Sequence, residues 1–449
     1  MENLEKGQIV ELKIDNIGSE GDGVGRIDDF VIFVKNALPS EVVKVKILSV
    51  SKSYAKAQIV DFLDKAHFRK NPECPHYSAC GGCDFMHVNY YKTIDFKIDI
   101  LFNNLKNIGK QKFNRDKINF IKAENKLYYR NKAIQFFDEK NGQIKMGFYK
   151  KGTHKIVDVP KCKIIDSRAL EMLNFIRENL KKYGIEIYNR DKNRGNLKAV
   201  GYRKSKRTNK YMLFFITKKD KINNIEKLVK KMDFQFSGIE SVYVNVNKND
   251  NVNLSDKNIK IMGKDFLEMY IGKAIYKILP NTFFQINSEQ TEKLYNTILK
   301  YLPFERMKIV WDLYGGVGAI SFFIASEFKK VYMIDSNKTS CDLARKNKTK
   351  NFATNVDVIH ANLENYDLSN LEKPGVVILD PPRRGIAQNV VNYLKKIKPV
   401  KLILISCDSA TLSRDINKFD EIYDLKKISL IDMFPQTHLI ESIALLERK

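Results

Sequence analysis

A cysteine closes one of the most apolar segments of the chain. Residues 402–405 are all aliphatic, and Ser406, Cys407 and Asp408 follow them directly. The aliphatic run predicts a parallel strand that is buried on both faces. Residues just past the carboxyl end of such a strand lie where open α/β sheets bind their ligands. Cys407 can therefore be a nucleophile. A free cysteine is often only a small buried residue, so the neighbouring segments must decide between the two interpretations.

A glycine-rich turn follows another predicted strand. Residues 311–313 lead into the turn 314–318, which holds three glycines. Glycines let the backbone approach a ligand closely, and the next strand ends at Asp335, about 20 residues further on, where related folds hold ribose hydroxyls. The Gly-x-Gly-x-x-Gly pattern of dinucleotide sites is incomplete, because position 321 is Ser321. We therefore expect S-adenosylmethionine rather than a dinucleotide.

A third predicted strand ends in Asp380-Pro381-Pro382-Arg383. Two prolines after an acid fix a rigid turn beside the cofactor. Methyltransferases that act on amino groups usually carry an aromatic residue after the second proline. Arg383 takes that position here, which argues against methylation of an exocyclic nitrogen.

Three cysteines lie within ten residues of one another: Cys74, Cys80 and Cys83. Crowded thiols with glycines between them predict a metal site, and Cys162 is the best candidate for a fourth ligand. Four thiolates suit zinc or an iron–sulfur cluster, and the spacing alone does not separate the two. His76 and His87 are alternative zinc ligands, but a set of four cysteines is simpler. With six cysteines in 449 residues, a disulfide framework is not expected.

Three predicted domains must position these groups. Residues 1–63 hold five short predicted strands and a turn-rich stretch at 18–25, which indicate a small OB-like β-barrel. Residues 64–262 begin with a predicted helix at 88–108, which we expect to pack on the catalytic domain. The rest of this segment reads as a central α+β domain, with strands at 133–137, 211–216 and 241–246 and helices at 167–183 and 221–232.

Residues 263–449 alternate strands and helices, which predicts a doubly wound, Rossmann-like α/β domain. Its expected strands lie at 309–313, 331–335, 356–360, 376–380 and 402–406, and two more apolar runs follow at 428–432 and 441–447. In this arrangement the polar residues described above gather at one edge of the sheet.

The charge balance points to a polyanionic partner. The chain carries a net charge of +25 and has a pI of about 9.5, which attracts RNA or DNA. A lysine-rich composition explains part of this excess, but residues 198–221 gather nine Lys or Arg against one acid. The polar start at residues 1–8 does not resemble a signal peptide, and no apolar run reaches membrane-spanning length. We expect a cytoplasmic protein without membrane contact.

The motifs together resemble those of the RNA uracil-5 methyltransferases. The similarity is greatest to the 23S ribosomal RNA (uracil-5-)-methyltransferase branch, which has an RNA-binding TRAM barrel and an iron–sulfur cluster, and it covers essentially the whole chain. It rests on the cysteine set, the glycine turn and a series of short motifs: residues 23–27, 33–34 and 37–39 in the barrel, then 282–287, 380–383, 406–408 and 432–441.

The resemblance implies roles for individual residues. It implies a [4Fe-4S] cluster on Cys74, Cys80, Cys83 and Cys162. It implies S-adenosylmethionine contacts at Gln285, Tyr314, Asp335 and Asp380. It makes Cys407 the nucleophile and Glu441 the base. The alternative interpretation of Glu441 is a surface acid at the start of a strand, without a role in the reaction. Two positions depart from the family pattern, since Gly315 replaces a cysteine and Asp335 stands where Glu is common.

The expected reaction explains these residue types. Carbon 5 of uracil is too weak a nucleophile to take a methyl group directly. A Cys407 thiolate can add to carbon 6, which makes carbon 5 nucleophilic toward the sulfonium methyl. Glu441 would then remove the carbon 5 proton so that the thiolate leaves, and the base must be extruded from any helix to reach the site. No electron is transferred, so the cluster is expected to hold the central domain together or to shape the RNA surface.

Alternatives remain open at this point. The substrate predicted first is 23S ribosomal RNA; the same reaction on tRNA is the second choice. A non-catalytic RNA-binding protein with the same fold is a third, which the presence of Cys407, Asp380 and Glu441 opposes. His438 either orients the site or caps a turn. We expect the protein to act as a monomer.

Overall fold

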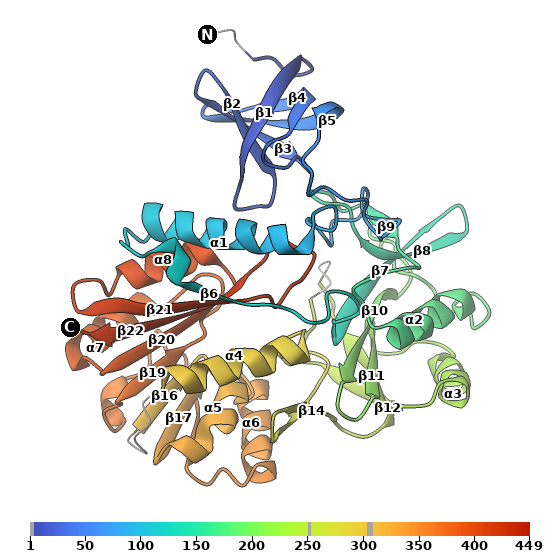
Figure 1. The fold of residues 1–449 in the computed structure, drawn as a ribbon. Coiled ribbons are helices and arrows are strands. Elements are labelled where there is room, and N and C mark those ends of the chain that lie inside the picture. The colour runs from blue at the N-terminus through green and yellow to red at the C-terminus, as the bar shows by residue number, and fades with distance from the viewer. Residues whose placement is uncertain (1–3, 250–252, 303–308) are drawn as a thin grey trace.

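A small closed barrel begins the chain in this computed structural model, which describes residues 4–249, 253–302 and 309–449 (Figure 1). The first three residues of the polar start therefore lie outside the described residues. The barrel has the strand order β1-β2-β3-β5-β4 and contains β1 (Ile9–Ile17), β2 (Gly23–Ile27), β3 (Phe30–Lys35), β4 (Val42–Val50) and β5 (Tyr54–Asp64). Alternate side chains such as Leu12 and Ile14 point into its core. The predicted five-stranded barrel is confirmed.

One boundary within the barrel differs from the sequence prediction. The stretch 18–25 was expected to form turns, but its last three residues begin β2. Gly25 lies so close to β1 that a Cβ there would stand 2.4 Å from the carbonyl oxygen of Lys13. This glycine therefore serves a close approach between two backbones rather than a turn.

A seven-stranded sheet forms the second part of the molecule, with the order β13-β12-β11-β10-β7-β8-β9. Its strands are β7 (Lys132–Lys140), β8 (Gln143–Tyr149), β9 (Ile156–Asp158), β10 (Leu197–Ser205), β11 (Lys210–Thr217), β12 (Ile239–Val246) and β13 (Asn258–Gly263). Helices α2 (Ser167–Asn179) and α3 (Ile225–Gln235) pack on one face. The other face packs against the hairpin of β14 (Leu267–Ile271) and β15 (Ala274–Ile278).

The third part is an eight-stranded sheet with the order β18-β17-β16-β19-β20-β22-β21-β6. Its strands are β16 (Ile309–Leu313), β17 (Lys330–Asp335), β18 (Val356–His360), β19 (Val376–Leu379), β20 (Lys401–Ser406), β21 (Tyr423–Ile431), β22 (Glu441–Arg448) and β6 (Ile118–Ile121). The strands from β18 to β20 run parallel, whereas β22 is antiparallel to β20 and β21. The doubly wound prediction is confirmed.

Helices cover both faces of this sheet, and each face has its own apolar core. One core includes α4 (Ser288–Tyr301), α5 (Ala319–Ile324) and α6 (Lys338–Lys350). The other includes α1 (Tyr90–Asn107), α7 (Gln388–Ile397) and α8 (Ser409–Asn417). Three short 3₁₀ turns lie at 115–117, 325–327 and 368–370. Among the described residues, none of the helices has the length and apolar character needed to cross a membrane.

Two elements cross from one part of the chain to another. Helix α1 and strand β6 precede the seven-stranded sheet in sequence, yet both belong to the third part (Figure 1). β6 pairs in parallel with β21, with Ile118 opposite Ile428 and Ile121 opposite Ile431. The predicted helix at 88–108 does pack on the third part, but β6 is only four residues long and gave no strand signal of its own.

A buried ion pair ties α1 to the segment that follows β21. The Lys97 ammonium donates to Asp432 Oδ1 at 2.7 Å and to the carbonyl oxygen of Phe434 at 3.2 Å. The Tyr90 hydroxyl donates to the other oxygen of Asp432 at 2.8 Å. The side chains of Lys97 and Asp432 are only 2% and 1% exposed. Because each charge lies out of reach of water, neither can lose its partner cheaply.

Replacing Lys97 with Met should therefore lower the free energy of unfolding by about 3–5 kcal/mol, since it leaves Asp432 buried without a cation. Lys92 on the same helix pairs with Asp95 at the surface, at 3.2 Å, so Lys92→Met should cost less than about 1 kcal/mol. Urea unfolding of both variants measures the difference. Equal losses would show that the Lys97 pair contributes no more than a surface pair.

Candidate functional site

The carboxyl edge of the third sheet gathers the predicted catalytic residues. Asp380 follows β19, and Cys407 follows β20 in the turn that leads into α8. β22 begins at this same edge with Glu441, and Ser406 pairs with Ser442 across the two strands. Cys407 follows Ser406, and Glu441 precedes Ser442 on the antiparallel neighbour. The two residues therefore lie side by side at the ends of neighbouring strands. The order of the strands produces this proximity between residues far apart in the sequence.

A pocket beside this edge holds most of the residues predicted to bind the cofactor. It is lined by Phe283, Phe284, Gln285, Tyr295, Tyr314, Gly315, Gly316, Val317, Ala319, Ile320 and Asp380. Asp335 is not part of this lining. Its carboxylate instead accepts the backbone N–H of Gly316 at 2.9 Å and that of Asn337 at 2.7 Å. Asp335 thus braces the glycine turn from the end of the next strand.

The glycine turn has an unusual backbone. Tyr314 adopts a left-handed conformation with φ 67°, which costs a non-glycine residue about 1–3 kcal/mol. Its hydroxyl accepts the N–H of Ala387 at 3.2 Å, which helps to hold it in place. A Cβ at Gly315 would lie 2.6 Å from Cγ of Met333. The glycine at this position therefore fits the neighbouring Met333 side chain, which a larger residue would have to displace.

Three acids at this edge hold their protons unusually tightly. Burial, together with the nearby charge of Asp335, raises the pKa of Asp312 to about 7. Burial and the charge of Asp312 raise the pKa of Asp380 to about 7 as well. Burial, and then the charge of Asp380, raise the pKa of Glu441 well above its usual value. These carboxyl groups would all ionise more readily beside a positively charged ligand.

Glu441 is buried rather than superficial. It is 2% exposed, so its interpretation as a surface acid is wrong. Across residues 4–249, 253–302 and 309–449, no side chain or backbone N–H donates a hydrogen bond to its carboxyl group. The carboxyl group is therefore available to a ligand or to a proton transfer.

Cys407 is partly buried, and two opposite charges act on its thiol. Burial and the charge of Glu441 raise the pKa of Cys407, whereas the guanidinium of Arg383 lowers it by charge and by hydrogen bonding. Sequence reasoning used Arg383 only to exclude one reaction and missed this contact. Its position directly after the Asp-Pro-Pro turn was the signal, because that turn and Cys407 end adjacent strands.

The turn between β21 and β22 is held from outside the third sheet. His438 Nδ1 lies 2.7 Å from Oδ2 of Asp84. Asp84 directly follows Cys83 in the chain. The backbone N–H groups of Asp84 and Phe85 both donate to the carbonyl oxygen of Gln436 at 3.0 Å. Lys151 bridges Asp84 to Asp22 of the barrel at 3.4 and 3.5 Å. His438 therefore orients this turn, which ends at Glu441.

The four cysteines predicted to bind a metal line one small cavity of about 50 Å³. Its other walls come from apolar side chains such as Tyr77, Met86 and Phe148, and from Arg130. The thiols are close enough for their charges to act on one another, and burial raises the pKa of Cys80, Cys83 and Cys162. Within the described part of the chain, no three His, Cys, Asp or Glu side chains converge closely enough to hold a single metal ion.

Comparison with known proteins gives a consistent result. Residues 90–449 match the model of the tRNA (uracil-5-)-methyltransferase family, and residues 3–60 match that of the TRAM domain. An uncharacterized RNA methyltransferase of Clostridium acetobutylicum is 35% identical, over 99% of this chain and 98% of that protein. One from Caldanaerobacter subterraneus subsp. tengcongensis is also 35% identical, over the full length of both chains.

Among solved structures, the Pyrococcus abyssi tRNA (uracil-54, C5)-methyltransferase in complex with S-adenosyl-L-homocysteine is similar throughout. It aligns with a TM-score of 0.77 and 24% sequence identity, covering 97% of this chain and 100% of that one. This similarity shows that the two proteins share a fold.

The contact between Arg383 and Cys407 predicts a change in thiol reactivity. Only the thiolate is alkylated, and a lost cation raises the pKa of Cys407. Arg383→Gln should therefore move the rise in iodoacetamide labelling of Cys407 to higher pH. Mass spectrometry of the labelled peptide follows this rise. Arg384→Gln is the matched control, because Arg384 pairs with Glu364 instead. An unchanged profile for Arg383→Gln would rule out the contact.

Proposed function

The chain belongs to the tRNA (uracil-5-)-methyltransferase family, and on this premise we propose that it methylates carbon 5 of a uridine in RNA. S-adenosylmethionine is the proposed methyl donor. The observation that carries the proposal is the position of the Cys407 thiol. It lies beside the buried Glu441 carboxyl group and the Arg383 guanidinium, and it follows the strand next to that of Asp380, which lines the pocket at the glycine turn.

The donor is proposed to bind in that pocket. Gln285, Tyr314 and Asp380 line it, while Asp335 braces the turn. We propose that the Asp335 carboxylate also accepts the ribose hydroxyls of the donor. The positive sulfonium favours ionised carboxylates, so its arrival lowers the raised pKa of Asp380 and Glu441. The glycine turn lets the backbone approach the donor closely.

The proposed reaction uses two side chains of this chain. The Cys407 thiolate adds to carbon 6 of uracil, and carbon 5 attacks the sulfonium methyl, which leaves S-adenosylhomocysteine. Glu441 takes the proton from carbon 5, and the bond between carbon 6 and sulfur breaks to release Cys407. Methyl transfer removes the positive charge of the donor. The pKa of Glu441 therefore rises again at the step in which it must accept a proton.

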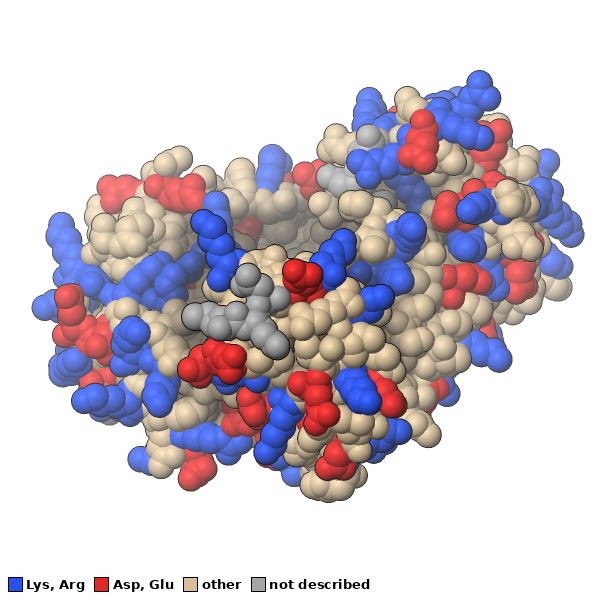
Figure 2. Space-filling model, turned by 90° about the horizontal axis from the view of Figure 1, so that it is seen from above, with Lys and Arg blue, Asp and Glu red and all other residues tan. Residues whose placement is uncertain are grey.

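The substrate is proposed to be 23S ribosomal RNA. The resemblance of the barrel and of the four-cysteine set to the ribosomal RNA branch supports this choice. The second candidate is tRNA, which the name of the matched family and that of the Pyrococcus abyssi enzyme favour. In either case RNA meets a basic surface: Figure 2 shows Lys and Arg side chains spread over one face and around a hollow in it. The target base must be extruded to reach Cys407.

We also propose that Cys74, Cys80, Cys83 and Cys162 hold a [4Fe-4S] cluster. Their shared apolar cavity supports it, because a cluster spreads its four thiolate ligands farther apart than a single ion does. Such a cluster would cross-link the loop at 74–83 to the segment around Cys162. It would also fix Asp84, and through Asp84 the His438 turn.

Mapping of 5-methyluridine in ribosomal and transfer RNA tests the proposed function. Cells that lack this protein should lose the modification at one or a few positions, and the wild-type gene should restore it. Cys407→Ala should restore none. Cys341→Ala is the control, because Cys341 is fully buried in α6 and its thiol, within the described part of the chain, bonds to two backbone carbonyl groups and to no side chain. Full restoration of 5-methyluridine by the Cys407→Ala variant would exclude Cys407 as the nucleophile.

Metal analysis after anaerobic purification tests the cluster. The wild-type protein should contain iron and acid-labile sulfide in equal amounts and should absorb visible light. Cys162→Ser should lose most of the iron, because three thiolates hold a cluster poorly. Stoichiometric zinc without iron in the wild-type protein would instead identify a mononuclear site.

A further inference from the structure

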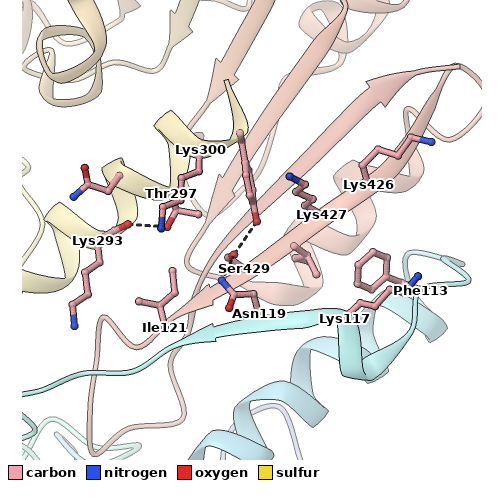
Figure 3. Close-up of a pocket in the computed structure, with 13 residues that line it drawn as sticks. Phe113, Lys117, Asn119, Ile121, Lys293, Thr297, Lys300, Lys426, Lys427 and Ser429 are labelled. Carbon is pink, nitrogen blue, oxygen red and sulfur yellow. Dashed lines mark hydrogen bonds between the residues drawn. The ribbon is translucent and has the colours of Figure 1, made fainter. Parts of the chain in front are cut away.

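A basic groove of about 620 Å³ lies at the free edge of the third sheet, apart from the site described above (Figure 3). Strands β6 and β21 form its floor, and helix α4 forms one wall. The groove is lined by Phe113, Lys117, Asn119, Ile121, Lys293, Asn296, Thr297, Lys300, Tyr301, Lys426, Lys427, Ile428 and Ser429. None of the other predicted sites includes these residues.

The charge of the groove exceeds what the composition explains. Five of its thirteen lining residues are lysine and none is acidic, whereas the whole chain has 78 Lys and Arg against 53 Asp and Glu. Lys293 pairs with Glu124 at 2.8 Å and Lys426 with Asp424 at 3.0 Å. The other three, Lys117, Lys300 and Lys427, form no ion pair with any residue that the structure describes.

The floor between these lysines is polar, and its side chains are joined by hydrogen bonds. The hydroxyls of Tyr301 and Ser429 lie 2.8 Å apart, and the Asn119 amide donates to Ser429 at 2.9 Å. The ammonium of Lys427 stands 5.8 Å from the centre of the Tyr301 ring. Figure 3 shows this hydrogen-bonded floor with lysines on both sides of it. The groove is thus a hydrogen-bonded polar surface with exposed cationic groups along its rim.

The groove also shares strand β21 with the edge of the sheet that holds Glu441. Ile431 of β21 lies opposite Glu441 of β22, and Ser429 precedes it by two residues on the same face of the sheet. The groove therefore begins about 7 Å along the strand from the register position of Glu441. The groove and Glu441 thus lie close together on neighbouring strands of one sheet.

We propose that this lysine groove binds phosphate groups of the RNA substrate, in a segment that flanks the target uridine. The inference rests on the proposed function. Lysine presents a compact charge on a flexible stem, which suits phosphate oxygens rather than base edges. Polymeric RNA offers several phosphates to several lysines at once, so the groove anchors the backbone and carries no sequence preference.

The experiment measures RNA affinity against salt for the full-length protein. The probes are a uridine-containing RNA hairpin of about 40 nucleotides and inorganic phosphate. The double variant Lys300→Gln/Lys427→Gln loses two lysine–phosphate contacts. The slope of log affinity against log salt concentration should therefore become shallower by about 1.4–1.8. Hairpin affinity at about 0.1 M salt should drop about tenfold. Lys300→Arg/Lys427→Arg should keep both values.

The matched control removes the same charge elsewhere. Lys227 and Lys230 are exposed on α3, at the far side of the second part (Figure 1). Lys227→Gln/Lys230→Gln should leave the slope within error of wild type. Equal losses in the two pairs would overturn the groove and indicate only a general charge effect. The proposal would also be overturned if millimolar inorganic phosphate displaced the labelled hairpin as effectively as unlabelled RNA does. That result would indicate a site for small anions. If the wild type binds no RNA at all, the proposed function itself fails.

Discussion

The turn between β21 and β22 is the constraint on which the site depends. It is held on one side by the buried Lys97–Asp432 pair from α1 and on the other by the contact of Asp84 with His438. Glu441 follows this turn immediately. Both anchors come from the segment before the second sheet, so the reaction site is completed by residues that are far from Glu441 in the sequence. The position of Glu441 is therefore a property of the whole molecule.

Electrostatics gives the site its second constraint. Asp312, Asp380 and Glu441 lie together with raised pKa values, and Arg383 provides the opposing charge next to Cys407. In the proposed reaction a cationic donor enters and a neutral product remains. The same carboxyl groups can thus attract the donor when ionised and accept a proton once the positive charge is gone.

Local patterns in the sequence predicted the barrel, the doubly wound sheet and the segments around Cys407 and Asp380. These features are encoded within short stretches, as alternating or continuous apolar runs and their turn residues. The four-residue strand β6 and the anchors of the Glu441 turn depend on contacts between distant segments, such as Lys97 with Asp432, which no local pattern reveals. The lysine groove was hidden for the same reason, since its lysines come from three separate elements. The division at residues 63 and 262 stays a prediction.

The most direct test of the account is whether a covalent bond joins Cys407 to RNA when proton removal is blocked. The Glu441→Gln variant is incubated with substrate RNA and S-adenosylmethionine, and the products are separated under denaturing conditions. The account predicts a stable protein–RNA adduct that carries the transferred methyl group and is absent when Cys407 is also replaced by Ala. Free methylated RNA at the wild-type rate, without any adduct, would contradict it.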